Sequence, residues 1–469
     1  MAAAQETRTE SDFLGDVDVP AEHYWGAQTQ RALTNFPIGE EVIPPPLIAA
    51  LGIVKHMAAR VNMDLGLLDQ SLGEAICQAA EEMADGALTA EFPLPVWQSG
   101  SGTQTNMNAN EVLAARANEI LTGTRGGKSP VHPNDHCNMS QSSNDTFPTA
   151  MHVAVLRRLH HGTLPGLTRL FDALNAKAEA YGDIIKVGRT HLMDAMPLTL
   201  GQEFSGYAKQ VESGIERLAA CEPRLSQLAQ GGTAVGTGIN APESFAEKFV
   251  ALLAERTGLP FRAAENRFEA QASHDALVEA SAALNGVAVS LMKIANDIRL
   301  MASGPRAGLA ELRLPANEPG SSIMPGKINP TQAEALTMVC AQVMGNHVAI
   351  TVSGAGGHFE LNAFKPVIVF NLLQSAGLIG DAAASFADRC VAGLEPDEER
   401  LKALMEGSLV LVTALNCHIG YDNAARIAKL ASEENLTLRE AALKLDLLSA
   451  EEFDAYMRPE EMVHPSRDP

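Results

Sequence analysis

The sequence has few aromatic residues and a shortage of positive charge. Aromatic side chains make up 5% of the 469 residues, and 35 lysines and arginines stand against 57 aspartates and glutamates, for a formal net charge of −22. A chain this acidic has no general attraction for nucleic acid or for anionic membrane surfaces, so we exclude both as partners. Any site for an anionic ligand must therefore create positive potential locally.

The chain also lacks paired cysteines, a long apolar run and a recognisable targeting segment. No apolar run approaches the length of a membrane span. The first residues show neither a signal peptide nor an Arg-rich transit pattern, so we expect a cytosolic protein. Without any CxxC pair, the six cysteines are expected to be buried, reduced thiols: Cys77, Cys137, Cys221, Cys340, Cys390 and Cys417.

Alanine and leucine are abundant and β-branched runs are few, which favours helices over sheet. We therefore expect an all-α fold. Residues 12–47 contain many prolines and glycines and are expected to be irregular, followed by helix from about 47 to 90. Further long helices are expected at 146–181, 198–230, 272–303, 331–352 and 362–388, and shorter ones at 397–416, 423–433 and 437–445.

The clearest helical pattern lies in residues 272–303. Leu284, Leu291 and Ile298 repeat every seven residues, and Val287, Ile294 and Met301 form an interleaved set. This spacing is typical of a coiled-coil-like seam, and its length favours a helix that crosses a subunit interface.

Changes in composition predict three domains. Residues 1–141 form an N-terminal domain with an irregular start and an active-site loop. Residues 142–392 form a central helical bundle. From residue 393 the chain becomes more charged, and 393–469 are expected to form a small helical C-terminal domain.

Four polar loops share one design, in which Ser, Thr or Asn accompanies Gly or Pro just before an expected helix. They are residues 99–105, 140–146, 188–191 and 320–330. If they converge, their backbone N–H groups and hydroxyls would bind carboxylates with little formal charge. Thr103 or Thr105 is expected to cap the helix after the first loop. In the last loop, Asn329 is expected to cap the next helix.

Other residues allow alternative interpretations. His191 titrates in a range suited to acid/base chemistry, and Glu334 is placed to orient it, although a lone histidine is more often merely exposed or capping. His132, Asp135, His136 and Cys137 resemble metal-ligand spacing, but Pro133 and Asn134 make the segment a turn, so we favour anion binding there. The glycine-rich run 231–238 lacks the Gly-Lys-Ser/Thr ending of a nucleotide-binding loop, so we expect a flexible connection between helices there and no nucleotide site.

Residues 320–330 match the signature GSSxMPxKxNP, and the chain resembles the fumarase/aspartase superfamily over nearly its whole length. Further matching stretches are residues 25–31, 99–104, 132–135, 140–148, 188–192 and 420–425. Within the superfamily the chain is most similar to class II, iron-independent fumarate hydratases, because residue 191 is His where aspartases typically carry Gln. An aspartate ammonia-lyase is the second interpretation, and a non-catalytic structural homologue, such as a lens crystallin, is the third.

The resemblance implies reversible hydration of fumarate to (S)-malate in the tricarboxylic acid cycle, without metal or cofactor. It implies an all-α homotetramer in which five-helix bundles form a twenty-helix core and each active site draws on three subunits. Ser321 corresponds to the base, and His191, paired with Glu334, to its acid/base partner. The implied substrate-binding residues are Ser101, Gly102, Thr103, Ser142, Ser143, Asn144, Thr190, Ser322, Lys327, Ile328 and Asn329.

The resemblance also implies a secondary dicarboxylate site at His132, Pro133, Asn134 and Asp135. Related proteins often carry Arg or Lys three residues before that histidine, whereas this chain has Ser129 there, next to Lys128.

Overall fold

The computed structural model describes residues 6–465. The chain folds into two compact units, each assembled from three separate segments. Unit 1 comprises Met1–Pro165, Gly214–Ala288 and Val339–Asp381, and unit 2 comprises Gly166–Ser213, Val289–Met338 and Ala382–Pro469. The three-domain division at residues 141/142 and 392/393 stays a prediction.

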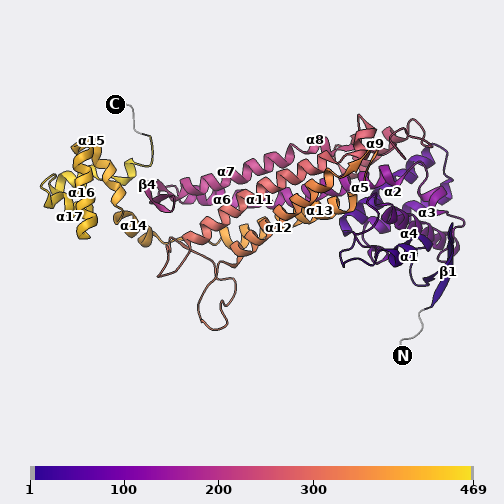
Figure 1. The fold of residues 1–469 in the computed structure, drawn as a ribbon, viewed down its shortest axis with the longest axis horizontal. Helices are drawn as coiled ribbons and strands as arrows, with labels where there is room; N and C mark the ends of the chain where they lie inside the picture. Colours follow the sequence, from indigo (N-terminus) through magenta and orange to yellow (C-terminus); the bar gives the residue numbers. More distant parts are fainter. Residues whose placement is uncertain (1–5, 466–469) are drawn as a thin grey trace. The chain divides into compact units, whose positions relative to one another are not determined.

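The structure is dominated by helices (Figure 1). They are α1 (Ala27–Asn35), α2 (Pro45–Asp64), α3 (Gln70–Ala84), α4 (Thr103–Thr122), α5 (Ser143–Arg158), α6 (Leu164–Ala180), α7 (Leu200–Ala219), α8 (Glu222–Leu225), α9 (Phe245–Thr257), α10 (Arg267–Ala272), α11 (Asp275–Met301), α12 (Thr331–Gly354), α13 (Lys365–Phe386), α14 (Glu398–Glu406), α15 (Asn416–Ile419), α16 (Tyr421–Glu434), α17 (Leu438–Lys444) and α18 (Ala450–Tyr456).

The strands form small two-stranded sheets. Four pairs are antiparallel and one, β5 with β6, is parallel. The strands are β1 (Thr7–Asp12) with β2 (Gly15–Pro20), β3 (Ile185–Thr190) with β4 (Met193–Thr199), β5 (Gln227–Leu228) with β6 (Arg262–Ala263), β7 (Leu312–Arg313) with β10 (Glu395–Pro396), and β8 (Gly357–His358) with β9 (Leu361–Asn362). The expected all-α class is confirmed.

Several parts of the chain differ from the expected elements. The long helix expected at 198–230 ends as α7 at Ala219 and is followed by the short α8 and the strand β5. Residues 12–47 are not simply irregular, because they contain most of the β1–β2 hairpin and all of α1. The expected helix at 146–181 is two helices, α5 and α6, joined by a π-helical turn at Leu159–Thr163. Residue spacing alone does not reveal such a turn, since the apolar pattern continues through it.

A buried carboxylate fixes the start of α1 in unit 1. The side chain of Glu111, on α4, is almost fully buried and accepts hydrogen bonds from the amides of Gly26, Gln28 and Thr29 at 2.8–3.0 Å. It also accepts the Thr29 hydroxyl at 2.6 Å. Burial raises the pKa of Glu111, and these four donors oppose that shift. The first amides of a helix have no partner within the helix, and here a side chain from a distant helix supplies one.

The long helices α7, α11, α12 and α13 are linked by polar contacts between neighbours (Figure 1). The Tyr207 hydroxyl of α7 donates to Asp297 of α11 at 3.0 Å, and Ser281 of α11 lies 2.9 Å from a ring nitrogen of His347 on α12. Asn346 of α12 donates to Ser375 of α13 at 3.0 Å. The predicted bundle is thus present as packed helices.

The heptad seam of α11 faces the interior of this chain. The seam residues Leu284, Val287, Leu291, Ile294, Ile298 and Met301 are each at most 4% exposed. The apolar residues that α11 leaves in water lie at other positions, Val289 at 54% and Leu300 at 42%. The seam therefore packs within one chain, and the expectation that α11 crosses a subunit interface stays a prediction.

Three helical segments are long and apolar enough to cross a membrane by length and composition. They are Asp275–Met301, Thr331–Gly354 and Lys365–Val391. The expectation that nothing approaches the length of a span was therefore wrong by this measure, because Ala, Val and Gly between the polar residues keep the average high. Within the protein, 44%, 28% and 56% of the most apolar stretch of these three segments, in that order, is buried.

The C-terminal part of unit 2 has a core of its own. Leu411, Leu415, Ile427, Leu438 and Phe453 are buried together there. The last helix of this core, α18, lies in a stretch where the sequence predicted none. All six cysteines are free thiols; five are buried as expected, but Cys417 is exposed.

We expect Glu111→Gln to lower the free energy of unfolding by about 2 kcal/mol. The amide has one acceptor oxygen where the carboxylate has two, so some of the four donors would be left buried and unpaired. Chemical denaturation at fixed protein concentration measures the change. Glu74→Gln, the same substitution on the exposed face of α3, is the control, and equal stability of the two variants would contradict the assignment.

Candidate active site

The first polar loop leads into α4 through a glycine. Gly102 stands at the N-cap with φ of +75°, so neither Thr103 nor Thr105 caps the helix as expected. A Cβ at Gly102 would lie 2.4 Å from the Phe147 ring, so no other residue fits without rearrangement. The Ser101 hydroxyl accepts the amide of Thr103 at 3.3 Å and is only slightly exposed. The loop is therefore a packed structure with its hydroxyls held in place.

The second polar loop meets the first within unit 1. Ser142 caps α5 in a capping box with Asp145, as the cluster of cap residues predicted. The hydroxyls of Thr103 and Ser143 are 2.9 Å apart, and Asn106 donates to Ser143 at 2.9 Å. Two of the four polar loops thus converge, and the N-termini of α4 and α5 lie beside each other with their partial positive charge.

Asp145 ties these loops to the glycine-rich run 231–238. Its carboxylate is completely buried; one oxygen accepts the amide of Ser142 at 2.9 Å, and the other accepts those of Gly231 at 3.0 Å and Thr233 at 2.9 Å. Next to it, Asn144 donates to the carbonyl of Ala234 at 2.8 Å. Burial raises the pKa of Asp145, and the backbone donors oppose that shift.

Asp145 was not among the residues expected in the site, because two of its partners, Gly231 and Thr233, lie 86 and 88 positions away along the chain. Asp145 stands three residues after the capping Ser142, and this spacing predicts a capping box. It predicts the hydrogen bond to Ser142 but not those to Gly231 and Thr233.

A buried lysine lies behind the first loop. The amide of Lys365 donates to the carbonyl of Gly100 at 3.0 Å, and its fully buried Nζ has no hydrogen-bond partner among the described residues. Desolvation lowers the pKa of Lys365 to about 8, partly offset by the charge of Asp145. Lys365 therefore adds a cation to the loop region of an otherwise acidic chain, and no sequence motif indicated it.

His191 and Thr190 lie at the tip of the β3–β4 hairpin in unit 2. His191 and Leu192 form the turn, with φ of +57° and +62°. Two-residue hairpin turns of this hand normally use Asn-Gly or Asp-Gly, so a His-Leu pair is an unusual choice. Side chains held in this region of φ often belong to functional sites. The turn leaves His191 exposed, where the sequence predicted only a loop before a helix.

Ion pairs anchor that hairpin inside unit 2. Glu311 is fully buried; Arg189 donates to one of its oxygens at 2.8 Å, and Lys186 Nζ lies 3.2 Å from the other. Lys186 also donates to Glu203 of α7 at 2.7 Å. Glu311 immediately precedes β7, which leads toward the signature loop. One buried carboxylate therefore connects β3, the strand that leads to His191, with the segment leading to Ser321.

The signature loop, residues 320–330, joins β7 to α12 and is mostly exposed. It closes on itself through the pairing of Gly320 with Pro325, and a Cβ at Gly320 would lie 1.9 Å from the Lys327 carbonyl. The remaining predicted residues are placed as follows: Ser321 and Asn329 are half-buried, and Ser322, Lys327, Ile328 and Glu334 are exposed.

One detail of this loop differs from expectation, and one expected pairing stays untested. Glu334 donates its amide to the carbonyl of Pro330 at 3.0 Å, so Pro330 and not Asn329 stands at the N-cap of α12. No hydrogen bond or ion pair joins His191 to Glu334 within residues 6–465, so their pairing stays a prediction.

The predicted secondary site is a short helical turn at Pro133–Cys137. Nδ1 of His132 accepts the amides of Asn134 and Asp135, both at 3.2 Å, and lies 3.3 Å from the Asp135 carboxylate. These two amides are therefore engaged by the histidine. Within residues 6–465, no group of three or more His, Cys, Asp or Glu side chains is placed to hold a metal ion.

Comparison with known proteins agrees with the pattern of loops. The lyase family profile matches residues 15–345, and the fumarase C C-terminal profile matches residues 411–464. The class II fumarate hydratase of Methylorubrum extorquens is 60% identical over 463 residues, which cover 99% of this chain and 98% of that protein. This chain belongs to the class II fumarate hydratase family.

Other members and solved structures agree with this family assignment. The mitochondrial fumarate hydratase of Rhizopus oryzae is 61% identical over 98% of this chain and 94% of that protein. The crystal structure of class II fumarase from Schistosoma mansoni matches with a TM-score of 0.95 and 44% identity, covering 98% of this chain and all of that one. A fumarate lyase:delta crystallin from Brucella melitensis, solved with bound cobalt, matches with a TM-score of 0.93, 43% identity and the same coverage.

The expectation of a cytosolic protein is overturned by these relatives. Several fumarate hydratases that are 58–61% identical over almost the whole chain, from fungus, plant and mammals, are named mitochondrial. Among sequences this similar, a missing transit pattern does not assign a compartment.

We expect Asp145→Asn to lower kcat/KM by about tenfold to a hundredfold, which corresponds to ~1.4–2.7 kcal/mol. In asparagine one of the two carboxylate oxygens is replaced by an NH2 group, which cannot accept a hydrogen bond. Either the amide of Ser142 or the amides of Gly231 and Thr233 would then lose their acceptor. Steady-state kinetics on the correctly assembled variant measures the effect. Asp172→Asn, an exposed position on α6, is the matched control. An assembled Asp145→Asn variant with control-like kinetics would rule the role out.

Proposed function

We propose that this protein catalyses the reversible hydration of fumarate to (S)-malate, by anti addition and elimination of water. The observation that carries the proposal is the identity of about 60% over the whole chain to proteins named fumarate hydratase. His191 supports it further, since the resemblance associates glutamine at that position with aspartases. The reaction belongs to the tricarboxylic acid cycle.

The convergent loops of unit 1 suit one carboxylate end of such a substrate. They offer hydroxyls and helix N-terminal amides, which bind anions without carrying charge themselves. The buried charge of Lys365 adds attraction for a dianion that the net charge of −22 would repel. We assign substrate binding there to Ser101, Gly102, Thr103, Ser142, Ser143 and Asn144.

The exposed loops of unit 2 supply the reacting groups in this proposal. Ser321 removes the C3 proton of malate, and His191, with Glu334, handles the departing hydroxide. Loss of that proton gives an aci-carboxylate with two negative charges, which Lys327 and backbone N–H groups stabilise more than the ground state. The same donors make a serine alkoxide accessible as a base. Thr190, Ser322, Ile328 and Asn329 complete the contacts to substrate.

We further propose that the protein is a homotetramer in which each active site draws on three subunits. Apolar side chains on the long helices support an assembly through them. Val289 and Leu300 of α11 are exposed, as are Met338, Val348 and Val352 of α12, at 63–67%. A twenty-helix core would cover such side chains. We retain the secondary dicarboxylate site at His132, Pro133, Asn134 and Asp135 as a proposal.

With malate alone, we expect the protein to generate the ultraviolet absorbance of the fumarate double bond. With aspartate alone, we expect no such absorbance, because His191 is suited to a leaving hydroxide. Absorbance that grows only with aspartate would identify an ammonia-lyase. Absorbance with neither substrate would support the structural homologue.

We expect Ser321→Ala to reduce malate dehydration by at least a thousandfold while KM changes little, since the lost group acts on the reacting proton. Ser205→Ala, the same change at an exposed serine of α7, is the control. Near-normal turnover by a folded Ser321→Ala variant would remove Ser321 from the role of base.

A further inference from the structure

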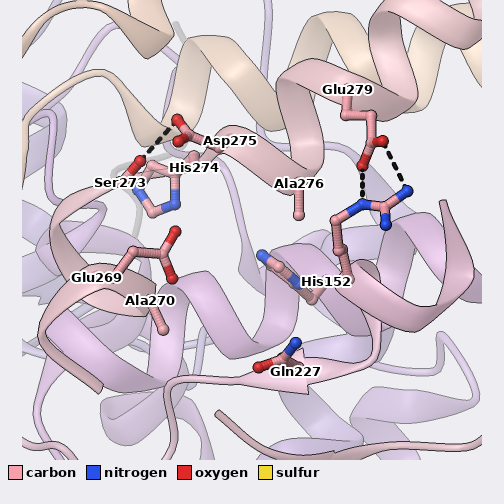
Figure 2. A pocket seen from close by; sticks show the side chains of 10 residues that line it. His152, Gln227, Glu269, Ala270, Ser273, His274, Asp275, Ala276 and Glu279 are labelled. Carbon is pink, nitrogen blue, oxygen red and sulfur yellow. Dashed lines mark hydrogen bonds and ion pairs between the residues drawn. The ribbon is translucent and has the colours of Figure 1, made fainter. Parts of the chain in front are cut away.

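A cavity of about 430 Å³ lies in unit 1 at the start of α11. None of the residues assigned to the candidate active site or to the secondary site lines it. Its wall combines single side chains of α5, α8 and β5 with the helix α10, the residues that follow it and the start of α11 (Figure 2). The polar lining residues are His152, Arg224, Gln227, Glu269, Ser273, His274, Asp275 and Glu279.

The tautomer of His152 follows from its hydrogen bond. Nδ1 lies 2.9 Å from the carbonyl of Leu225, which can only accept, so Nδ1 carries the proton. Burial lowers the pKa of His152 and keeps the ring neutral. Its Nε2 is therefore an unprotonated acceptor, and Figure 2 shows the ring turned toward the cavity.

His274 presents further polar atoms with no partner. The side chain is 1% exposed, and neither ring nitrogen has a hydrogen-bond partner within the described residues. Burial, with the nearby charge of Lys365, lowers the pKa of His274 and keeps this ring neutral as well. A buried polar atom without a partner destabilises the folded state, which indicates a missing partner.

The cavity wall carries more negative than positive charge. Its one guanidinium, Arg224, is already paired with both oxygens of Glu279. Asp275 accepts the hydroxyl of Ser273 at 2.7 Å, whereas Glu269 has neither an ion pair nor a hydrogen bond to its carboxylate within residues 6–465. Glu269 is exposed, and partial desolvation together with the charge of Asp275 raises the pKa of its carboxyl.

The unused groups share one requirement. Figure 2 shows Glu269, His152 and His274 around the same space, and each has an atom that can accept from an N–H donor. They are not close enough together to hold a metal ion. A partner must therefore be larger than an ion, positively charged, and able to donate more than one hydrogen bond.

We propose that this cavity binds a small organic cation with several N–H donors, of the primary alkylammonium class. In this site the ammonium group donates to the Glu269 carboxylate and to Nε2 of His152, and the alkyl part lies toward Ala270 and Ala276. The site is separate from the loops that bind the dicarboxylate, so it takes a ligand of opposite charge.

Isothermal titration calorimetry of the intact protein with ethylammonium chloride tests the proposal. We expect saturable binding of one ethylammonium per chain and at least tenfold weaker binding of tetramethylammonium, a cation without N–H donors. Glu269→Gln should weaken ethylammonium binding at least tenfold. Glu265→Gln, which removes the same charge from an exposed residue outside the cavity, should leave it within twofold. Fumarate hydration by Glu269→Gln should match the wild type.

Three results would overturn the proposal. Equal binding of the two cations would show general attraction to an acidic surface. Equal loss in Glu265→Gln and Glu269→Gln would place the effect outside the cavity. Saturable Zn²⁺ binding that Glu269→Gln abolishes, without any ethylammonium binding, would indicate a metal site. If thermal melting shows that the Glu269→Gln variant does not fold, the comparison of ethylammonium with tetramethylammonium binding to the wild type tests the proposal by itself.

Discussion

A buried carboxylate is stable only when several donors surround it, and this constraint shapes the parts of the chain that concern function. Glu111, Asp145 and Glu311 are each almost or fully buried. Each draws in backbone amides or cations from segments distant in sequence. The segments so held are the first turn of α1, the loops around Ser142 and Gly231, and the strand β3 of the hairpin that carries His191. The loops are therefore positioned by their anchors.

The two groups of proposed site residues differ in how firmly they are held. In unit 1, Ser143 and Thr103 are bonded to each other and rest on Asp145, which holds the glycine-rich run as well. In unit 2, His191 and Ser321 project from exposed turns, and only the bases of those segments are fixed, through Glu311. A firm binding surface and exposed reacting groups are consistent with a site that more than one chain completes.

The sequence predicted what depends on local pattern. The helix at 272–303 appears as α11 within three residues, and the capping residues of 140–146 open α5 as expected. The sequence did not predict features that depend on residues far away along the chain. The β3–β4 hairpin has a turn that propensity disfavours, held by ion pairs that no periodicity shows. The burial of the α11 seam depends on which helices of the same chain cover it. For Asp145, the capping box was readable, whereas its bonds to Gly231 and Thr233 were not.

The apolar side chains left in water on α11 and α12 have a consequence for how this protein behaves as a solute. A chain alone in solution keeps Val348 and Val352 hydrated, and any association that covers them lowers the free energy of the folded state. By mass action, resistance to heat and denaturant then rises with protein concentration. Dilution would then lower the stability of the folded protein, as a low concentration of denaturant does.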